Sequence, residues 1–262
     1  MPYALRLIGV ALLASLGWWQ WQPDPPALAT LPAPTRVEVV AMAAELPAKP
    51  LRLTLKASAC LERCAEFELD ALQFPQAPEL THAFLAAIDA HAGPSPEERV
   101  MAMAKTLLKE AAEFHEPWQQ IVKAQQVPGI SNIVVIDIDN YTYTGGAHGM
   151  NVVSALNWDT RLQRVVTLKD TLLPEQADAF WREAKQVHQK WSAMQPDAKS
   201  LVDGWPFDKT DVFALLPAGL VLKYQPYALG PYSMGTPELV IPYARLGGIL
   251  KSEYLPKSNA IR

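Results

Sequence analysis

The chain has 262 residues and a formal net charge of −4, and half of its residues are hydrophobic. This length and hydrophobic content suit one sizeable domain or two small ones with a packed core. Because the sequence has no lysine- or arginine-rich cluster, nucleic acid is a poor candidate partner.

The N-terminus has the pattern of an export signal. A single arginine precedes an uncharged run from Leu7 to Trp19, which fits the apolar region of a signal peptide and is shorter than the ~20 residues of a membrane span. Ala27-Leu-Ala29 has the small-x-small form of a cleavage site. Tryptophans at the end of the run suit a membrane interface, so an uncleaved anchor is the alternative. We assign residues 1–29 to a signal peptide or N-terminal inner-membrane anchor and 30–35 to a Pro/Ala-rich linker, which places the protein in the periplasm or cell envelope.

The cysteines of the chain are Cys60 and Cys64, separated by three residues. In an oxidising compartment, two cysteines this close most simply form a local disulfide. Free thiols and a metal or redox site are the alternatives. A zinc site would need two more ligands, and no histidine lies nearby in the sequence before His82. The sequence therefore predicts a disulfide and gives no indication of a metal or a cofactor.

The first part of the exported chain, residues 36–126, is predicted to be an N-terminal α+β subdomain. Apolar and polar residues alternate from Leu51 onward, as in a half-buried strand. Ser95-Pro-Glu-Glu98 has the form of a capping box with proline at the first helical position. These patterns predict strands at 37–40, 51–59 and 64–74, and helices at 80–90 and 96–114.

The second part, residues 127–262, is predicted to be a C-terminal α+β domain. A β-branched run from Ile133 to Asp139 leads into a glycine-rich turn and a return strand, which is the pattern of a hairpin. Because hairpins outnumber helical crossovers, the expected fold class is α+β, with a mainly antiparallel sheet packed with helices in two small, closely associated subdomains. The remaining predictions are strands at 150–158, 164–168, 212–216, 220–224 and 238–242, helices at 174–194 and 243–250, and a loop at 197–209.

Several segments of the second part together resemble one known family of extracytoplasmic domains. They are Tyr143-Thr-Gly-Gly-Ala-His-Gly149, Asn157-Trp-Asp159, Val166-Thr-Leu-Lys-Asp170, Ala218-Gly-Leu-Val-Leu-Lys-Tyr-Gln-Pro-Tyr227, Gly230-Pro-Tyr232 and Leu239-Val-Ile-Pro-Tyr243. In order and spacing they resemble the C-terminal domain of RsiV-type anti-sigma factors and PdaC-type peptidoglycan deacetylases. Residues 36–126 more weakly resemble the domain that precedes it. The resemblance implies an extracytoplasmic unit, which in RsiV-type proteins is a sensor that binds lysozyme and in the deacetylases accompanies a separate catalytic domain.

His148, in the glycine-rich turn, is the residue that most invites a chemical role. It could act as a general base or a metal ligand with Asp137 or Asp139. A strand rises ~3.3 Å per residue, however, so Asp139 should lie well behind the turn. Alternatively, His148 belongs to a binding surface, or it hydrogen-bonds the loop backbone while glycines 145, 146 and 149 supply positive φ angles.

Other candidate chemistry is sparse. The sequence has no nucleophile elbow, no His-Glu-x-x-His and no phosphate-binding loop. The two aspartates at 137 and 139 are expected on the solvated face of a strand. The remaining histidines, at 82, 91, 115 and 188, are expected at the surface or at helix edges.

Tyrosines and prolines gather between residues 224 and 243, and such residues build rigid, amphipathic contact surfaces. Local packing of each ring in its own loop is the alternative. We interpret the protein as a non-enzymatic envelope domain that binds an envelope protein, such as a lysozyme-like muramidase, or cell-wall glycan. The alternatives are a peptidoglycan hydrolase or deacetylase that uses His148, and a structural module without a dedicated ligand. The candidate binding residues are Tyr143, Gly145, Gly146, His148, Tyr227 and Tyr232.

Overall fold

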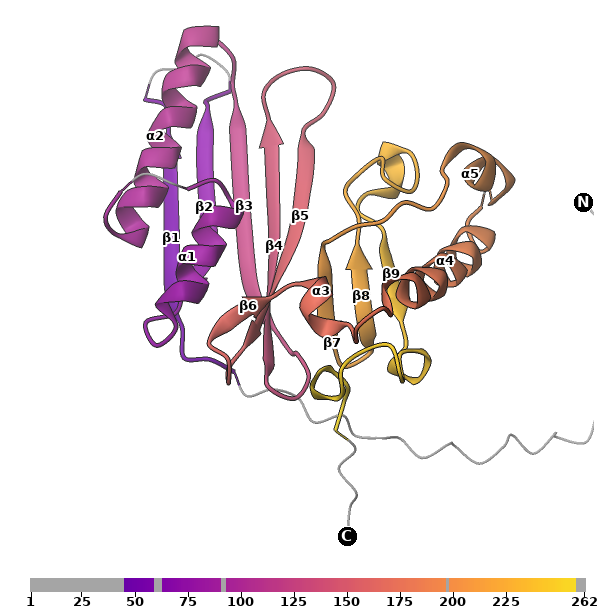
Figure 1. The fold of residues 1–262 in the computed structure, drawn as a ribbon. Coiled ribbons are helices and arrows are strands. Elements are labelled where there is room, and N and C mark those ends of the chain that lie inside the picture. The colour runs from indigo at the N-terminus through magenta and orange to yellow at the C-terminus, as the bar shows by residue number, and fades with distance from the viewer. Residues whose placement is uncertain (1–44, 59–62, 91–92, 197, 258–262) are drawn as a thin grey trace, which may run out of the picture. The chain divides into compact units, whose positions relative to one another are not determined.

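The protein is built around two β-sheets (Figure 1). The computed structural model describes residues 45–58, 63–90, 93–196 and 198–257. The strands are β1 (Lys49–Lys56), β2 (Glu66–Gln73), β3 (Gln119–Val127), β4 (Ile133–Tyr143), β5 (Met150–Asp159), β6 (Arg164–Val166), β7 (Phe213–Leu216), β8 (Gly219–Lys223) and β9 (Glu238–Ile241). The first six form one sheet in chain order, and the last three form the second.

Helices and short 3-10 turns connect the strands. They are α1 (Pro78–Ala87), α2 (Pro96–Phe114), α3 (Leu168–Thr171), α4 (Ala177–Ala193) and α5 (Ala198–Gly204), with 3-10 turns at Tyr232–Met234, Tyr243–Arg245 and Ser252–Tyr254. None of the helices in the described part of the chain combines the length and the apolar character needed to cross a membrane. The predicted α+β class with a mainly antiparallel sheet is confirmed.

The exception to the antiparallel pairing is the pair β2–β3, which is parallel. A parallel pair needs a long crossover connection, and α1 and α2 supply it here. The start of α2 is as predicted: Pro96 opens the helix and the Ser95 hydroxyl accepts a hydrogen bond from the Glu98 N–H at 3.2 Å. The capping sequence therefore fixes where the chain turns back along the sheet.

Strand β3 was not predicted from the sequence, although it pairs with β4 over its whole length. Its sequence is rich in glutamine, and the inward positions include Gln120 as well as Val122 and Ala124. Gln120 is accommodated because its side chain donates a hydrogen bond to Asn140 Oδ1 at 3.0 Å on the neighbouring strand. The polar inward residue concealed the alternation that marks a half-buried strand.

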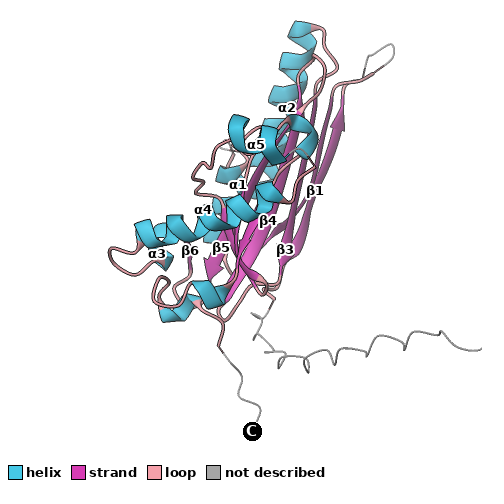
Figure 2. Ribbon diagram, turned by 90° about the vertical axis from the view of Figure 1, so that its right-hand side faces the viewer, coloured by secondary structure: helices cyan, strands magenta, loops and turns pink. Residues whose placement is uncertain are grey.

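Strand β4 has apolar residues on both faces, and each face lies in a different core. Val134, Ile136 and Ile138 pack in a cluster with α1 and α2. Ile133 and Val135 pack in a second cluster with β7, β8, β9 and α4. Strands β3 and β4 run side by side through the first sheet in both views (Figures 1 and 2). The predicted division of the chain between 126 and 127 falls within β3, and it stays a prediction.

Two side-chain amides join the second sheet to β5. Asn157, which is fully buried, donates from Nδ2 to Phe213 O and accepts at Oδ1 from Leu215 N, both at 2.8 Å. Gln225 accepts from Val153 N at 2.8 Å and donates to Val153 O at 2.7 Å. Each amide therefore forms the pair of hydrogen bonds that a neighbouring strand would form.

A partly buried cluster of three charged side chains forms a third connection between the sheets. The Lys223 ammonium lies 2.7 Å from Asp137 Oδ1 and 2.8 Å from Glu238 Oε1. Burial lowers the pKa of Lys223, but the hydrogen bonds and charges of the two carboxylates raise it by more, so its pKa is above the usual value. Asp137 is only partly solvated, because its side chain is 30% exposed and binds Lys223 of the second sheet. Asp139 is exposed, as expected.

The chain after α4 also departs from the predictions. The segment predicted as a loop contains α5, a short helix whose one buried residue is Leu201. With so few turns, no apolar periodicity could reveal it. The predicted helix at 243–250 is reduced to a 3-10 turn at Tyr243–Arg245.

Some predictions concern residues outside the described ranges. These are the signal peptide or anchor, the linker, the strand at 37–40, Cys60 and His91. The disulfide between Cys60 and Cys64 consequently stays a prediction.

Candidate functional site

The turn between β4 and β5 depends on two glycines in left-handed conformations. Gly145 has φ +102° and Gly146 has φ +86°, which confirms the predicted use of glycine at both positions. The Tyr143 hydroxyl donates to Gly146 O at 3.1 Å and so closes the turn on itself. Three of the candidate binding residues therefore shape and stiffen the turn.

Gly149 has a different role from the one predicted. Its φ is not positive, and the reason for glycine is close packing. A Cβ atom built at this position would lie 2.5 Å from the Tyr141 hydroxyl oxygen and 2.6 Å from the Thr142 carbonyl oxygen. The chain can pass this point only without a side chain.

The loop between β8 and β9 faces this turn. Tyr227 adopts φ +69°, a left-handed conformation that is uncommon for a residue with a side chain, and the residue is 44% exposed. Tyr232 lies in the first 3-10 turn and is partly exposed. Tyr224 and Tyr243 differ from these two, since burial raises the pKa of both hydroxyls well above its usual value. They belong to the packing of the second sheet.

His148 is held between the turn and this loop. Its ring stacks on Tyr232 with 3.8 Å between centroids and 17° between planes, and the Tyr232 hydroxyl donates to Gly149 O at 2.9 Å. His148 Nδ1 lies 2.9 Å from Gly149 O, and Nε2 lies 3.3 Å from the Tyr227 hydroxyl. Because a carbonyl can only accept, Nδ1 carries the proton, and in the neutral ring Nε2 accepts from Tyr227. Both nitrogens are thus engaged within the protein.

The contact extends to a residue that sequence reasoning missed. Trp205 follows α5 and stacks beside Tyr227, with 6.5 Å between centroids and 25° between planes. Tyr227 in turn lies 5.7 Å from Tyr232. The signal available in the sequence was the tryptophan itself, a large aromatic residue within a segment predicted to be a loop. We call His148, Trp205, Tyr227 and Tyr232 the aromatic surface.

Among the described residues, the hydrogen-bonding partners of the His148 ring are Gly149 and Tyr227, and neither proposed aspartate is one of them. Asp137, one proposed partner, is bound to Lys223 on β8. Burial raises the pKa of Asp139, and the charge of Asp137 adds to the effect. Within the described ranges, no three His, Cys, Asp or Glu side chains come together in a way that could hold a metal ion.

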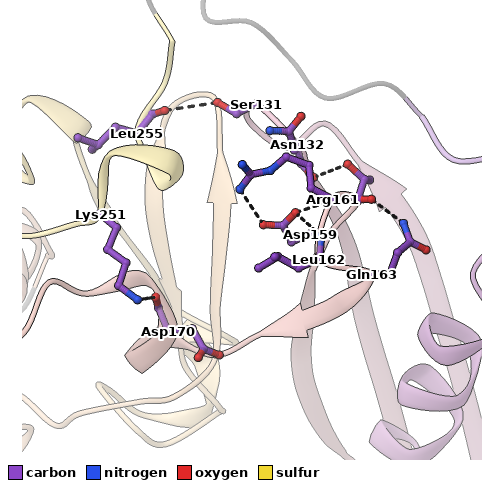
Figure 3. Close-up of polar contacts among 10 residues, drawn as sticks. Ser131, Asn132, Asp159, Arg161, Leu162, Gln163, Asp170, Lys251 and Leu255 are labelled. Atoms are coloured by element: carbon purple, nitrogen blue, oxygen red, sulfur yellow. Dashed lines mark hydrogen bonds and ion pairs between the residues drawn. The ribbon is translucent and has the colours of Figure 1, made fainter.

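Asp159, the last residue of the segment Asn157-Trp-Asp159, has a structural role (Figure 3). Buried Asp159 accepts from the backbone N–H groups of Arg161 at 2.9 Å and Leu162 at 3.1 Å, and its second oxygen lies 3.3 Å from the Arg161 guanidinium. These contacts form the turn into β6. Nearby, Ser131 donates to Leu255 O at 3.4 Å, which ties the last 3-10 turn to the start of β4.

Asp170 is also structural. With Thr167 it forms a capping box at the start of α3, and its Oδ2 lies 3.1 Å from Arg164 Nη1. The bond from Arg164, followed by that from the Thr167 backbone, lowers the pKa of Asp170 to about 2. Lys251 donates to the Asp170 carbonyl at 2.7 Å and joins the C-terminal segment to α3 (Figure 3).

His188 on α4 was expected at the surface, and this was wrong. The side chain is buried and packs near Trp191 and Phe207, with ring centroids 5.8 and 5.6 Å away. Its Nε2 has no hydrogen-bond partner among the described residues. Burial, with a smaller effect from Lys185, lowers the pKa of His188.

Comparison with known proteins gives matches in sequence and in structure. Residues 169–244 match the DUF3298 family, described as "Protein of unknown function". A DUF3298 family protein from Pseudomonas aeruginosa PAO1 has a similar crystal structure, with 32% sequence identity, a TM-score of 0.70, and coverage of 82% of this chain and 98% of that one. A DUF3298 member from Bacteroides fragilis NCTC 9343 shares the fold at 16% identity, with a TM-score of 0.65 and coverage of 82% and 96%. No curated protein matches the chain significantly.

Proposed function

This chain belongs to the DUF3298 family, and we propose that it is a non-enzymatic, exported cell-envelope domain that binds a partner through the aromatic surface. The observation that carries the proposal is the stacking of His148 on Tyr232, with Tyr227 hydrogen-bonded to the same imidazole. Two segments about 80 residues apart in sequence are held together there by four ring and hydrogen-bond contacts. Rigid, partly exposed aromatic rings are well suited to binding, because little side-chain entropy is lost on contact.

The sequence supports the location and the kind of partner. The apolar N-terminal run and the small-x-small motif support export to the periplasm or anchoring in the inner membrane. The resemblance to RsiV-type and PdaC-type extracytoplasmic domains suggests a lysozyme-like muramidase as the partner. This step is an analogy at the level of the family, so it needs its own test.

The test is a binding measurement on the full chain in mild detergent against a purified lysozyme by biolayer interferometry. We expect His148→Ala and Tyr232→Ala to weaken binding by at least about tenfold, because each removes one of the two stacked rings at the centre of the surface. His82→Ala is the matched control, since His82 is an exposed histidine on α1 that lies 3.9 Å from exposed Glu79.

Thermal unfolding of each variant separates lost contact from lost fold. Undiminished binding by a folded His148→Ala, Tyr232→Ala double variant would show that the aromatic surface is not the contact. Hydrolysis or deacetylation of purified peptidoglycan that disappears in His148→Ala and persists in His82→Ala would contradict the non-enzymatic role.

A further inference from the structure

We propose that a pocket beside the aromatic surface binds an uncharged sugar. The pocket has a volume of about 540 Å³ and lies between the end of α4, α5 and the β8–β9 loop. Its apolar lining comes chiefly from Trp191, Trp205, Leu201 and Met234. This size lies within the range of pockets that hold small ligands. The proposal adds a ligand class to the binding role above and rests on it only for the choice of a cell-wall sugar as the probe.

The chemistry of the lining favours a neutral ligand that is apolar on its faces and polar at its edges. The two indole rings offer flat apolar faces. Sugar rings carry C–H groups on their faces and hydroxyl groups around the rim, so they can stack on such surfaces. None of the described residues that line the pocket is charged, which disfavours phosphates, carboxylates and cationic peptides.

Polar groups at the pocket are available to a ligand. The Ser200 and Ser233 hydroxyls are exposed, and no hydrogen bond engages either one within the described residues. Gln195 uses its amide nitrogen to donate to Trp191 O at 3.1 Å, and no donor among the described residues engages its side-chain carbonyl oxygen. Hydroxyl and amide groups of this kind complement the hydroxyls and acetamide of an N-acetylated sugar.

The pocket is also preformed. Prolines 196, 231 and 237 line it and have fixed backbone φ angles. Two lining residues pack closely against the backbone of Gly230, since a Cβ there would collide with Met234 Sδ and lie 3.3 Å from Leu201 Cδ1. A pocket that is rigid before binding loses less conformational entropy when the ligand arrives.

Trp205 connects the pocket to the aromatic surface, since it lines the first and stacks beside Tyr227 in the second. A glycan strand in the pocket would therefore lie next to a protein bound at His148. The two sites remain separable by mutation, because His148 does not line the pocket and Gln195 is not part of the aromatic surface.

The test is isothermal titration of the full chain with triacetylchitotriose, using cellotriose and a proline-rich peptide as comparison ligands. We expect the chitotriose to bind the native protein, Trp205→Ala to weaken the binding by at least about tenfold, and Gln195→Ala to weaken it by about threefold or more. Gln195 is partly exposed, so we expect Gln195→Ala to fold normally, and misfolding would not explain weaker sugar binding by this variant. Trp118→Phe, outside the pocket, is the control for loss of a tryptophan.

His148→Ala should retain sugar binding even where it loses muramidase binding, so the two proposals fail independently. The sugar proposal is overturned by no heat of binding up to about 10 mM chitotriose. It is equally overturned by unchanged affinity in both Trp205→Ala and Gln195→Ala, or by binding of the proline-rich peptide in place of either sugar. Equal binding of cellotriose would keep the pocket as a sugar site and remove the role of the acetamide.

Discussion

Asn157 holds Leu215 as a neighbouring β-strand would, accepting its N–H at 2.8 Å while donating to the carbonyl of Phe213 two residues earlier. The side chain replaces a missing strand partner at the edge of β7. Asn157, Phe213 and Leu215 are all buried, so the Leu215 N–H and the Phe213 carbonyl cannot hydrogen-bond to water instead.

Replacing Asn157 with alanine should therefore destabilise the fold strongly. The change leaves a buried N–H and a buried carbonyl without partners, and we expect a loss of about 2–4 kcal/mol in the free energy of unfolding. Urea denaturation followed by circular dichroism measures it. Asn151→Ala, a partly exposed position on the same strand, should cost less than about 0.5 kcal/mol. Equal losses of unfolding free energy in the two variants would show that the hydrogen bonds of Asn157 contribute no more to stability than the side chain of Asn151 does.

The glycines of the β4–β5 turn should respond differently to substitution. Gly149→Ala forces the new methyl group into Tyr141 and the Thr142 backbone, so we expect a loss of about 1–3 kcal/mol and a displaced turn. Gly146→Ala meets no atom within 4 Å and incurs only the left-handed backbone strain of about 1 kcal/mol. Thermal unfolding ranks the two. A Gly146 variant less stable than the Gly149 variant would contradict this assignment of steric and backbone causes.

His188 should make the stability of the fold depend on pH in the mildly acidic range. Its pKa is lowered in the folded protein, so the unfolded chain binds a proton first as the pH falls. Stability is therefore fully present above the unfolded pKa of about 6.5 and declines as the pH falls below it. His188→Phe should reduce the difference between melting temperatures at pH 7.5 and about pH 5. The same change at exposed His82 should leave that difference intact, and a matching reduction there would remove His188 as the cause.

Asp170 should make the stability of the fold depend on pH in a lower range than His188 does. Its pKa of about 2 lies below the value of about 3.9 in an unfolded chain, so its charge stabilises the fold above pH 4 and this contribution is lost as the pH falls toward 2. Because the pair with Arg164 is open to solvent, we expect Asp170→Asn to cost no more than about 1 kcal/mol at pH 7. Denaturation at pH 7 and at about pH 2.5 should show the cost shrinking at the lower pH; a constant cost would point to the cap geometry alone.

The sequence allowed the fold class and the β4–β5 hairpin to be predicted because their signals are local. Ser95 and Pro96 mark the start of α2, and Gly145 and Gly146 mark a turn whose backbone needs glycine. Strand β3 was missed because Gln120 sits at an inward position and is satisfied by a residue on another strand. The period of two is visible only when inward residues are apolar.

Three of the four residues of the aromatic surface were named from the sequence, whereas Trp205 and the contacts among the four were not. His148, Tyr227 and Tyr232 were grouped by a family pattern, and the structure places their rings together. No local rule relates a histidine in one turn to a tyrosine 79 residues later. For the same reason, Asn157 and Gln225 gave no sign of their role, since their backbone partners lie 56 to 72 residues away.

Strand β4 has a consequence for how the protein unfolds. Ile136 faces one core and Val135 faces the other, so neither core can separate from this strand without exposing an apolar face to water. A disturbance of the core around α1 should therefore also weaken the packing around β8, because the single strand β4 contributes side chains to both cores. We expect hydrogen exchange of the β4 amides to occur only through opening of the entire described fold, which would make this strand the slowest-exchanging segment.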